Sequence, residues 1–224
     1  MNKTKLGLPL EVKYCSKCLM SNQKPFSVNE TTHNKKSKKD TLKIDKDGIC
    51  DACWYAMNKD NDIDWEYREK LLIKELDKFR TNNGQYDCIV SGSGGKDSSK
   101  ISHILKYKYG MNPLTVTWAP TMYTEIGYKN FINWINIGGF DNLLFTPNGR
   151  VMRKLTYEAF VNLLFPFQPF KFGIKFWAVK MAIKMNIKLV MYGEPYAEYG
   201  SNPDEDKSSP IRNKKYFVND SKRN

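Results

Sequence analysis

The sequence predicts an α/β fold, a parallel sheet with helices on both faces, preceded by a small cysteine-rich unit. From residue 86 onward, short apolar segments alternate with amphipathic segments of helical period, which is typical of parallel strands joined by crossover helices. The first apolar segment runs into a glycine-rich loop, and two Cys-x-x-Cys pairs lie before residue 60. These three features predict two units of different kinds.

The order of these features divides the 224 residues into four expected segments. They are a ribbon-like cysteine unit over residues 1–60, a linking helix over 61–84, the α/β domain over 85–200 and a polar, flexible tail over 201–224. In the second segment, four apolar side chains recur at helical spacing among charged residues, which predicts an amphipathic helix. They are Trp65, Leu72, Leu76 and Phe79.

Four of the five cysteines form two Cys-x-x-Cys pairs, Cys15 with Cys18 and Cys50 with Cys53. Each pair can place two thiolates on one tetrahedral metal, and the doubled pattern is typical of a Zn²⁺ site. Four thiolates leave no open position for chemistry, so we expect the zinc to be structural. The remaining Cys88 falls inside a predicted strand, where we expect an inert, buried thiol.

The stretch between the two cysteine pairs is longer than a short zinc ribbon needs. Its residues 34–43 are polar and carry five lysines, which predicts a solvated loop. Deleting this loop is therefore expected to leave zinc content and stability nearly unchanged. Lys46, Asp47 and Gly48 then predict the turn that delivers the second cysteine pair.

Four strands and their connecting helices are expected in the α/β domain. The strands are predicted at residues 86–90, 114–118, 142–146 and 188–192, and the later helices at 128–137, 150–164 and 172–183. Ligands of open parallel sheets bind beyond the carboxyl ends of the strands. The loops that follow the four strands are therefore expected to meet over a shared ligand.

The loop after the first strand reads Ser93-Gly94-Gly95-Lys96-Asp97-Ser98. It is not a Walker A loop, which requires Gly-Lys-Ser/Thr, and it is not a dinucleotide fingerprint, because Asp97 stands where the third glycine belongs. We expect Asp97, Ser98 and Ser99 to cap the following helix. N–H groups at the positive end of a helix form a ready phosphate site, and paired glycines let the phosphate approach.

Ser-Gly-Gly-x-Asp-Ser after a strand resembles the phosphate loop of the PP-loop ATP pyrophosphatases. The resemblance implies that ATP binds at Ser93, Gly94, Gly95, Lys96, Asp97 and Ser98 and is cleaved between its α and β phosphates. Lys96 would stabilise the departing pyrophosphate, and Asp97 would hold a Mg²⁺ ion that bridges phosphate oxygens. The alternatives are a solvated lysine and a plain helix cap.

Further motifs over about residues 13–200 resemble the N-acetyl sugar amidotransferases of bacterial surface-polysaccharide pathways, of the LPS O-antigen and pseudaminic acid type. They are Tyr14-Cys15-Ser16-Lys17-Cys18-Leu19-Met20, Asp47-Gly48-Ile49-Cys50-Asp51-Ala52-Cys53, Ile63-Asp64-Trp65, Tyr86-Asp87-Cys88-Ile89-Val90, and Tyr192-Gly193-Glu194 with Tyr199-Gly200. The resemblance implies a transferase that adenylates the acetamido oxygen of a nucleotide-sugar, after which ammonia displaces AMP and leaves an acetamidino group. Separate glutaminase and cyclase-like subunits would supply the ammonia.

Glu194 follows the fourth predicted strand, where it could orient the substrate or the metal. We therefore include it, with Lys96 and Asp97, among the expected catalytic residues. The alternative is a loop carboxylate without a catalytic role.

The net charge of +12 favours anionic partners, although a solvated lysine-rich surface would give the same value. No apolar run is long enough for a membrane span, and no apolar segment suggests export, so we expect a cytoplasmic protein. The functional alternatives are a PP-loop enzyme that modifies tRNA, and a nucleotide-binding protein that docks on a partner without activity of its own. No cysteine follows Cys88, which disfavours sulfur transfer and makes nucleic acid the less favoured partner.

Overall fold

The computed structural model describes residues 4–5, 7–25, 38 and 40–193. The described chain divides into two compact units, one up to Tyr67 and the other from Arg68 onward. The expected tail over residues 201–224 lies outside the described residues. In the part of the chain that is described, no helix has the length and apolar character needed to cross a membrane.

The second cysteine pair of the first unit is delivered by the tight turn that the sequence predicts. The carboxylate of Asp45 accepts hydrogen bonds from the N–H groups of Asp47 and Ile49, and Gly48 adopts a φ of +77°. Helix α1 (Asp51–Asp62) begins directly after this turn, with Cys50 as its N-cap. The sequence does not predict α1, because none of its described side chains is buried and no apolar stripe marks it.

One end of the stretch predicted to be a solvated loop is packed instead. Leu42 is only 4% exposed and packs with Cys15 and Cys50. Its N–H group donates to the carbonyl of Lys24 at 3.1 Å. Deleting residues 34–43 would remove part of the small core around the cysteines, so the expectation of a harmless deletion is wrong at this end. Residues 34–37 and 39 lie outside the described residues.

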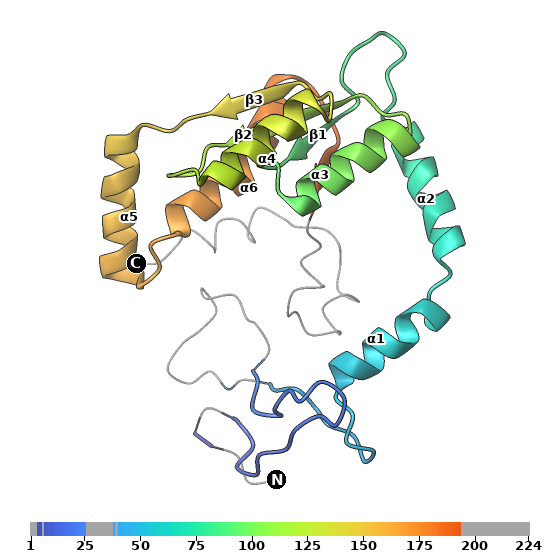
Figure 1. The fold of residues 1–224 in the computed structure, drawn as a ribbon, viewed down its shortest axis with the longest axis vertical. Coiled ribbons are helices and arrows are strands. Elements are labelled where there is room, and N and C mark those ends of the chain that lie inside the picture. The colour runs from blue at the N-terminus through green and yellow to red at the C-terminus, as the bar shows by residue number, and fades with distance from the viewer. Residues whose placement is uncertain (1–3, 6, 26–37, 39, 194–224) are drawn as a thin grey trace. The chain divides into compact units, whose positions relative to one another are not determined.

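Four parallel strands form the sheet of the second unit, in the order β3-β2-β1-β4 (Figure 1). The strands are β1 (Cys88–Ser91), β2 (Pro113–Trp118), β3 (Asn142–Phe145) and β4 (Val190–Tyr192). The helices are α2 (Trp65–Asp77), α3 (Lys96–His103), α4 (Glu125–Asn136), α5 (Gly149–Leu163) and α6 (Gln168–Lys184), and the π-helix η2 (Ile104–Lys108) continues α3. The predicted α/β fold with a parallel sheet is confirmed.

Helices cover both faces of this sheet, as the sequence predicts. On one face, Val90 of β1 packs with Leu76 of α2 and with Leu105 of η2. On the other face, the neighbouring Ile89 packs with Ala178 of α6. Successive side chains of a strand point to opposite faces, so these two buried clusters place α2 and α3 on one side and α6 on the other.

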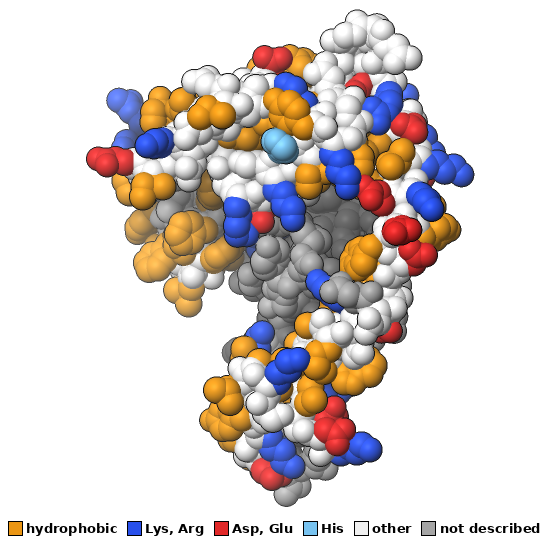
Figure 2. Space-filling model, turned by 45° about the vertical axis from the view of Figure 1, so that its right-hand side comes forward, with side chains coloured by type: hydrophobic (Ala, Val, Ile, Leu, Met, Phe, Trp, Pro, Cys, Tyr) orange, Lys and Arg blue, Asp and Glu red, His pale blue; other side chains and the backbone are white. Residues whose placement is uncertain are grey.

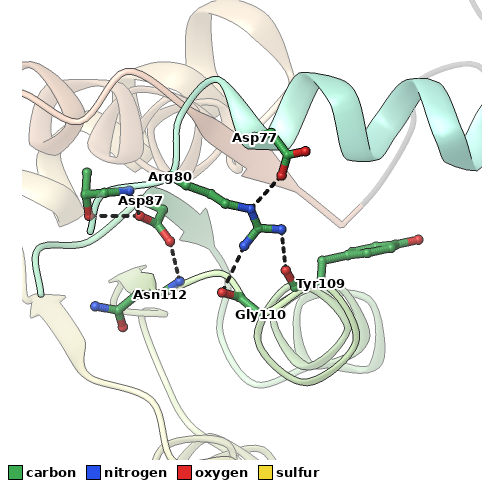
Figure 3. Close-up of polar contacts among 7 residues, drawn as sticks. Asp77, Arg80, Asp87, Tyr109, Gly110 and Asn112 are labelled. Carbon is green, nitrogen blue, oxygen red and sulfur yellow. Dashed lines mark hydrogen bonds and ion pairs between the residues drawn. The ribbon is translucent and has the colours of Figure 1, made fainter. Parts of the chain in front are cut away.

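The amino ends of β1 and β2 are tied together by polar side chains (Figure 3). Asp87 is only 6% exposed, and its carboxylate accepts hydrogen bonds from the N–H groups of Thr81 at 2.6 Å and Asn112 at 2.7 Å. The Thr81 hydroxyl donates to the same carboxylate at 2.9 Å. Arg80 donates to the carbonyl of Gly110 at 3.0 Å. These hydrogen bonds, here called the clasp, hold the segment that enters β1 against the segment that enters β2.

Replacing Asp87 by asparagine is expected to lower the free energy of unfolding by about 1.5–3 kcal/mol, the range for hydrogen bonds to a charged group. The amide nitrogen would donate where the carboxylate now accepts, so at least one N–H group would lose its partner. Asp77→Asn is the control, because Asp77 pairs with Arg80 at the surface, where an ion pair adds little. Urea denaturation gives the free energy of unfolding of both variants. Equal denaturation midpoints would contradict the stabilising role of the clasp.

Candidate functional site

Four sulfur atoms from the two cysteine pairs lie together in the first unit. The Sγ atoms of Cys15, Cys18, Cys50 and Cys53 are all within 4.8 Å of one another. Cys15 and Cys53 are separated by 3.9 Å, and Cys18 and Cys50 by 3.7 Å. Zn–S bonds of about 2.3 Å in a tetrahedron place sulfur atoms about 3.8 Å apart. The cluster is therefore compatible with the Zn²⁺ ion that the sequence predicts, and the four sulfurs fill every position of a tetrahedron.

Backbone N–H groups point at these sulfurs. Cys15 Sγ accepts hydrogen bonds from the N–H groups of Lys17 at 3.4 Å and Cys50 at 3.3 Å. Backbone hydrogen bonds, that of Cys18 foremost, lower the pKa of the Cys15 thiol to about 6. The pKa of Cys53 is raised to about 12, foremost by its hydrogen bond with the Cys18 side chain. Thiolates this close repel one another, and a divalent cation would supply the charge that lets all four ionise.

Cys88, the fifth cysteine, is buried within β1 and lies outside this cluster. Burial raises the pKa of its thiol to about 12, so the thiol is protonated at neutral pH and is a poor nucleophile. Its position agrees with the expectation of a buried thiol without chemistry, and it offers a control for the four-cysteine cluster.

We expect the purified protein to carry about one zinc ion per chain. Cys50→Ser should remove most of this zinc and loosen the first unit, since Cys50 also caps α1. Cys88→Ala should retain the metal, because Cys88 lies in the sheet of the other unit. Elemental analysis by mass spectrometry measures the zinc content. A zinc-free wild-type protein, or a Cys50→Ser variant with full zinc content, would contradict the assignment.

The glycine loop leads from β1 directly into α3, which begins at Lys96 with Gly95 as its N-cap. No side chain among the described residues caps this end of the helix. The expectation that Asp97, Ser98 and Ser99 are capping residues is therefore wrong, because the helix begins before them and they lie in its first turn. The first N–H groups of a helix have no acceptor within it, so those of α3 face the loop as donors.

Two glycines of this loop are required by packing. A Cβ atom at Gly92 would lie 2.2 Å from the Cβ of Ser98. Gly94 has a φ of +82°, and a Cβ atom there would lie 2.7 Å from the Cα of Phe131 in α4. Any other residue at either position would force the surrounding backbone to move.

Gly95 differs from its neighbours. Its φ of −70° and ψ of 166° suit any residue type. Among the described residues, a Cβ atom there would meet no other heavy atom within 4 Å, its own chain neighbours aside. Glycine is a common N-cap residue, but its backbone angles and its contacts with the described residues do not require it at this position. In the part of the chain that is described, the space in front of the start of α3 is therefore large enough for a phosphate group.

The loop lies where the topology of the sheet reverses. The chain moves from β1 outward through β2 and β3, and then returns to place β4 on the other side of β1. Ligands of open α/β sheets bind at the carboxyl ends of the strands at this kind of position. Gly193, directly after β4, lies so close to α3 that a Cβ atom there would be 2.6 Å from the carbonyl carbon of Asp97.

Of the four loops expected to meet, the one after β4 therefore begins in direct contact with the first turn of α3, the helix that follows the glycine loop. The sequence analysis gives Gly193 no role of its own. The sequence did contain one indication of this contact. A glycine directly after a predicted strand, as at Gly193, indicates a close approach of two backbones.

The polar residues of the loop lie at the start of α3. Lys96 Nζ is 2.8 Å from both carboxylate oxygens of Asp97, and the Lys96 side chain is 80% exposed. Ser98 is 8% exposed, and its hydroxyl donates to the carbonyl of Gly95 at 3.1 Å. The expected ATP-binding residues thus converge on one helix start. Glu194, the third expected catalytic residue, lies outside the described residues.

No protein-family model matches the chain, and a search of the curated proteins found no match. Among solved structures, the chain is similar to the crystal structure of a predicted subunit of tRNA methyltransferase from Methanocaldococcus jannaschii, at 18% sequence identity and a TM-score of 0.37. The similarity covers 61% of this chain and 63% of that chain, so this chain spans less than two thirds of it. An overlap of this quality supports no argument about function.

Valine substitutions at Gly94 and Gly95 distinguish a glycine that packing requires from a glycine that faces open space. Gly95→Val is expected to lose less stability than Gly94→Val, because its side chain meets no described residue and only the N-cap preference for glycine over valine is lost. Gly94→Val is expected to cost at least about 1 kcal/mol of stability, since its φ of +82° disfavours a branched residue and its Cβ meets α4. Differential scanning fluorimetry compares the two. A Gly95→Val variant that melts as low as Gly94→Val would show that residue 95 is packed.

Proposed function

We propose that this chain binds ATP at the glycine loop and cleaves it between the α and β phosphates in order to activate a substrate oxygen. The observation that carries the proposal is the space at Gly95, which is free of side chains among the described residues and lies before a helix start that none of these side chains caps. Its position at the topological switch point of the sheet supports a ligand there. The motif Ser-Gly-Gly-x-Asp-Ser, with its resemblance to PP-loop ATP pyrophosphatases, fits this position.

The basic side chains on α3 favour an anionic ligand at the glycine loop. Lys96, Lys100 and His103 are all exposed along this helix. Figure 2 shows the histidine of the described residues, His103, in pale blue with Lys and Arg side chains around it. The chain as a whole carries a net charge of +12. A positive surface beside the loop raises the local concentration of nucleotides.

In the first step, the oxygen of the substrate amide attacks the α phosphorus of ATP. The bond from that phosphorus to the bridging oxygen of the β phosphate breaks, and pyrophosphate leaves. Loop N–H groups and Lys96, which turns from Asp97 to the phosphates, stabilise the leaving negative charge. Asp97 is the residue that would hold Mg²⁺, which when bound neutralises phosphate charge.

In the second step, ammonia attacks the carbon of the adenylated group, and AMP departs as the amide carbonyl is replaced by an imino group. The acceptor we propose is an N-acetyl sugar carried on a nucleotide, as in bacterial surface-polysaccharide biosynthesis, and the product is an acetamidino sugar. The motif resemblance across both units supports this choice. Glutaminase and cyclase-like partners would deliver the ammonia, and Glu194 would orient the acceptor.

A PP-loop enzyme that modifies tRNA is the second candidate. The net charge of +12 and the exposed lysines of α3 suit the phosphates of an RNA. Sulfur transfer is disfavoured, because the thiol of Cys88 is buried and protonated and the other four cysteines form the metal cluster. The two candidates share the ATP chemistry and differ in the acceptor.

Product analysis with α-labelled and γ-labelled ATP tests the proposal. With N-acetylated nucleotide-sugars and ammonium, we expect labelled AMP and labelled pyrophosphate in equal amounts, with an acetamidino sugar found by mass spectrometry. Gly95→Val should lose this turnover while remaining folded, because its side chain fills the phosphate space. A parallel reaction with unmodified tRNA as acceptor tests the second candidate.

Three outcomes are decisive for this test. ADP as the main product would overturn the PP-loop assignment. AMP formation that depends on tRNA alone would favour the second candidate. Tight ATP binding with no turnover on any acceptor would indicate a nucleotide-binding protein without activity of its own.

A further inference from the structure

A buried tryptophan in α4 connects the glycine loop to the body of α3. Trp134 is 4% exposed, and its indole Nε1 donates a hydrogen bond of 2.8 Å to the hydroxyl of Ser102. Ser102 is fully buried, and its hydroxyl donates to the carbonyl of Ser98 at 2.8 Å. Ser98 in turn donates to the carbonyl of Gly95. A continuous series of hydrogen bonds therefore runs from α4 to the residue in front of the helix start.

The far edge of the same indole lies against the other end of the loop. A Cβ atom at Gly92 would be 3.0 Å from Cη2 of Trp134. One rigid side chain thus contacts the segment that leaves β1 and, through Ser102, the first turn of α3. The backbone of α4 adds a third contact at Gly94, which lies against Phe131.

The start of α3 needs an external support of this kind. The α-helical part of α3 is only 8 residues long and gives way to the π-helix η2 at Ile104. No side-chain cap holds its first turn among the described residues. Ser102, one turn after Ser98, is where the hydrogen bond from Trp134 reaches the helix. Because this contact is fully buried, losing it would leave the indole N–H without a partner.

We propose that Trp134 is a positioning residue that fixes the direction of the first N–H groups of α3 toward the phosphates. The inference rests on the proposed function, in which those N–H groups bind ATP. A phosphate-binding constellation must be held within about 0.5 Å of its productive geometry by supporting contacts. The indole of Trp134 meets this requirement at both ends of the loop without touching the ligand.

Trp134→Phe tests the proposal, because it removes the N–H donor and keeps an aromatic ring in the pocket. Phe140→Leu is the matched control: Phe140 is 5% exposed and packs in the same cluster as Trp134, but its side chain has no polar atom that could donate a hydrogen bond to Ser102. Both variants are expected to lower the melting temperature by similar amounts. Trp134→Phe alone should weaken ATP binding, by roughly tenfold, the effect expected for one lost hydrogen bond.

Two measurements distinguish a positioning role of Trp134 from a general loss of stability. Isothermal titration with ATP and with inorganic pyrophosphate gives the dissociation constants. Amide NMR shifts of Gly92, Gly94 and Gly95 in the ligand-free chain report the loop directly, and they should move in Trp134→Phe but stay near wild-type values in Phe140→Leu. Equal effects of the two variants on affinity and on these shifts would overturn the inference.

The proposed function and this inference fail in different ways. If the wild-type chain binds neither ATP nor pyrophosphate, the proposed function fails. The amide shifts then still decide whether Trp134 orients the loop. Unchanged loop shifts in Trp134→Phe, with ATP bound as tightly as by the wild-type chain, would refute the role of Trp134 and leave the ATP chemistry standing.

Discussion

Close backbone approach around the first turn of α3 is the constraint on which the candidate site depends. Gly92 brings the exit of β1 over Ser98, Gly94 lies against α4, and Gly193 brings the end of β4 against Asp97. Each approach leaves no room for a Cβ atom: Gly92 lies against the side chains of Ser98 and Trp134, whereas Gly94 and Gly193 lie against main-chain atoms. The donors at the helix start are thereby placed beside two strand ends, where no described side chain caps them. A wider spacing at any one contact would let the turn shift relative to the sheet.

The two ends of the sheet differ in whether their backbone N–H donors find acceptors within the described chain. At the amino ends, the buried carboxylate of Asp87 accepts hydrogen bonds from Thr81 and Asn112, so the donors there are satisfied within the chain. At the carboxyl ends, the first N–H groups of α3 are not capped by any described side chain. Buried polar groups cost stability when they lack partners, so a fold tolerates open donors only where water or a ligand can reach them. This asymmetry is a physical reason to place the ligand at the carboxyl edge.

Periodicity and turn chemistry predicted most of the second unit. The strands and helices from β1 to β4 follow the alternation of apolar and amphipathic segments, and the cysteine spacing predicted the cluster in the first unit. Helix α1 was missed because its described side chains bury no apolar stripe. Leu42 was assigned to a solvated loop because a single apolar residue among lysines carries no periodic signal. Only its contacts with Cys15 and Cys50 reveal that it is core.

The candidate site shows most clearly why the sequence alone is insufficient. Gly92, Gly94 and Gly95 are the same residue type, yet a side chain on the first would strike Ser98, one on the second would strike α4, and one on the third would enter open space. A motif match treats the three as equivalent. Trp134 has no motif at all, since its contact with Ser102 joins residues 32 positions apart. Packing accounts for two of the glycines and for the tryptophan beneath them, whereas Gly95, the N-cap of α3, has room for a side chain among the described residues, and that room is where we propose the phosphates bind.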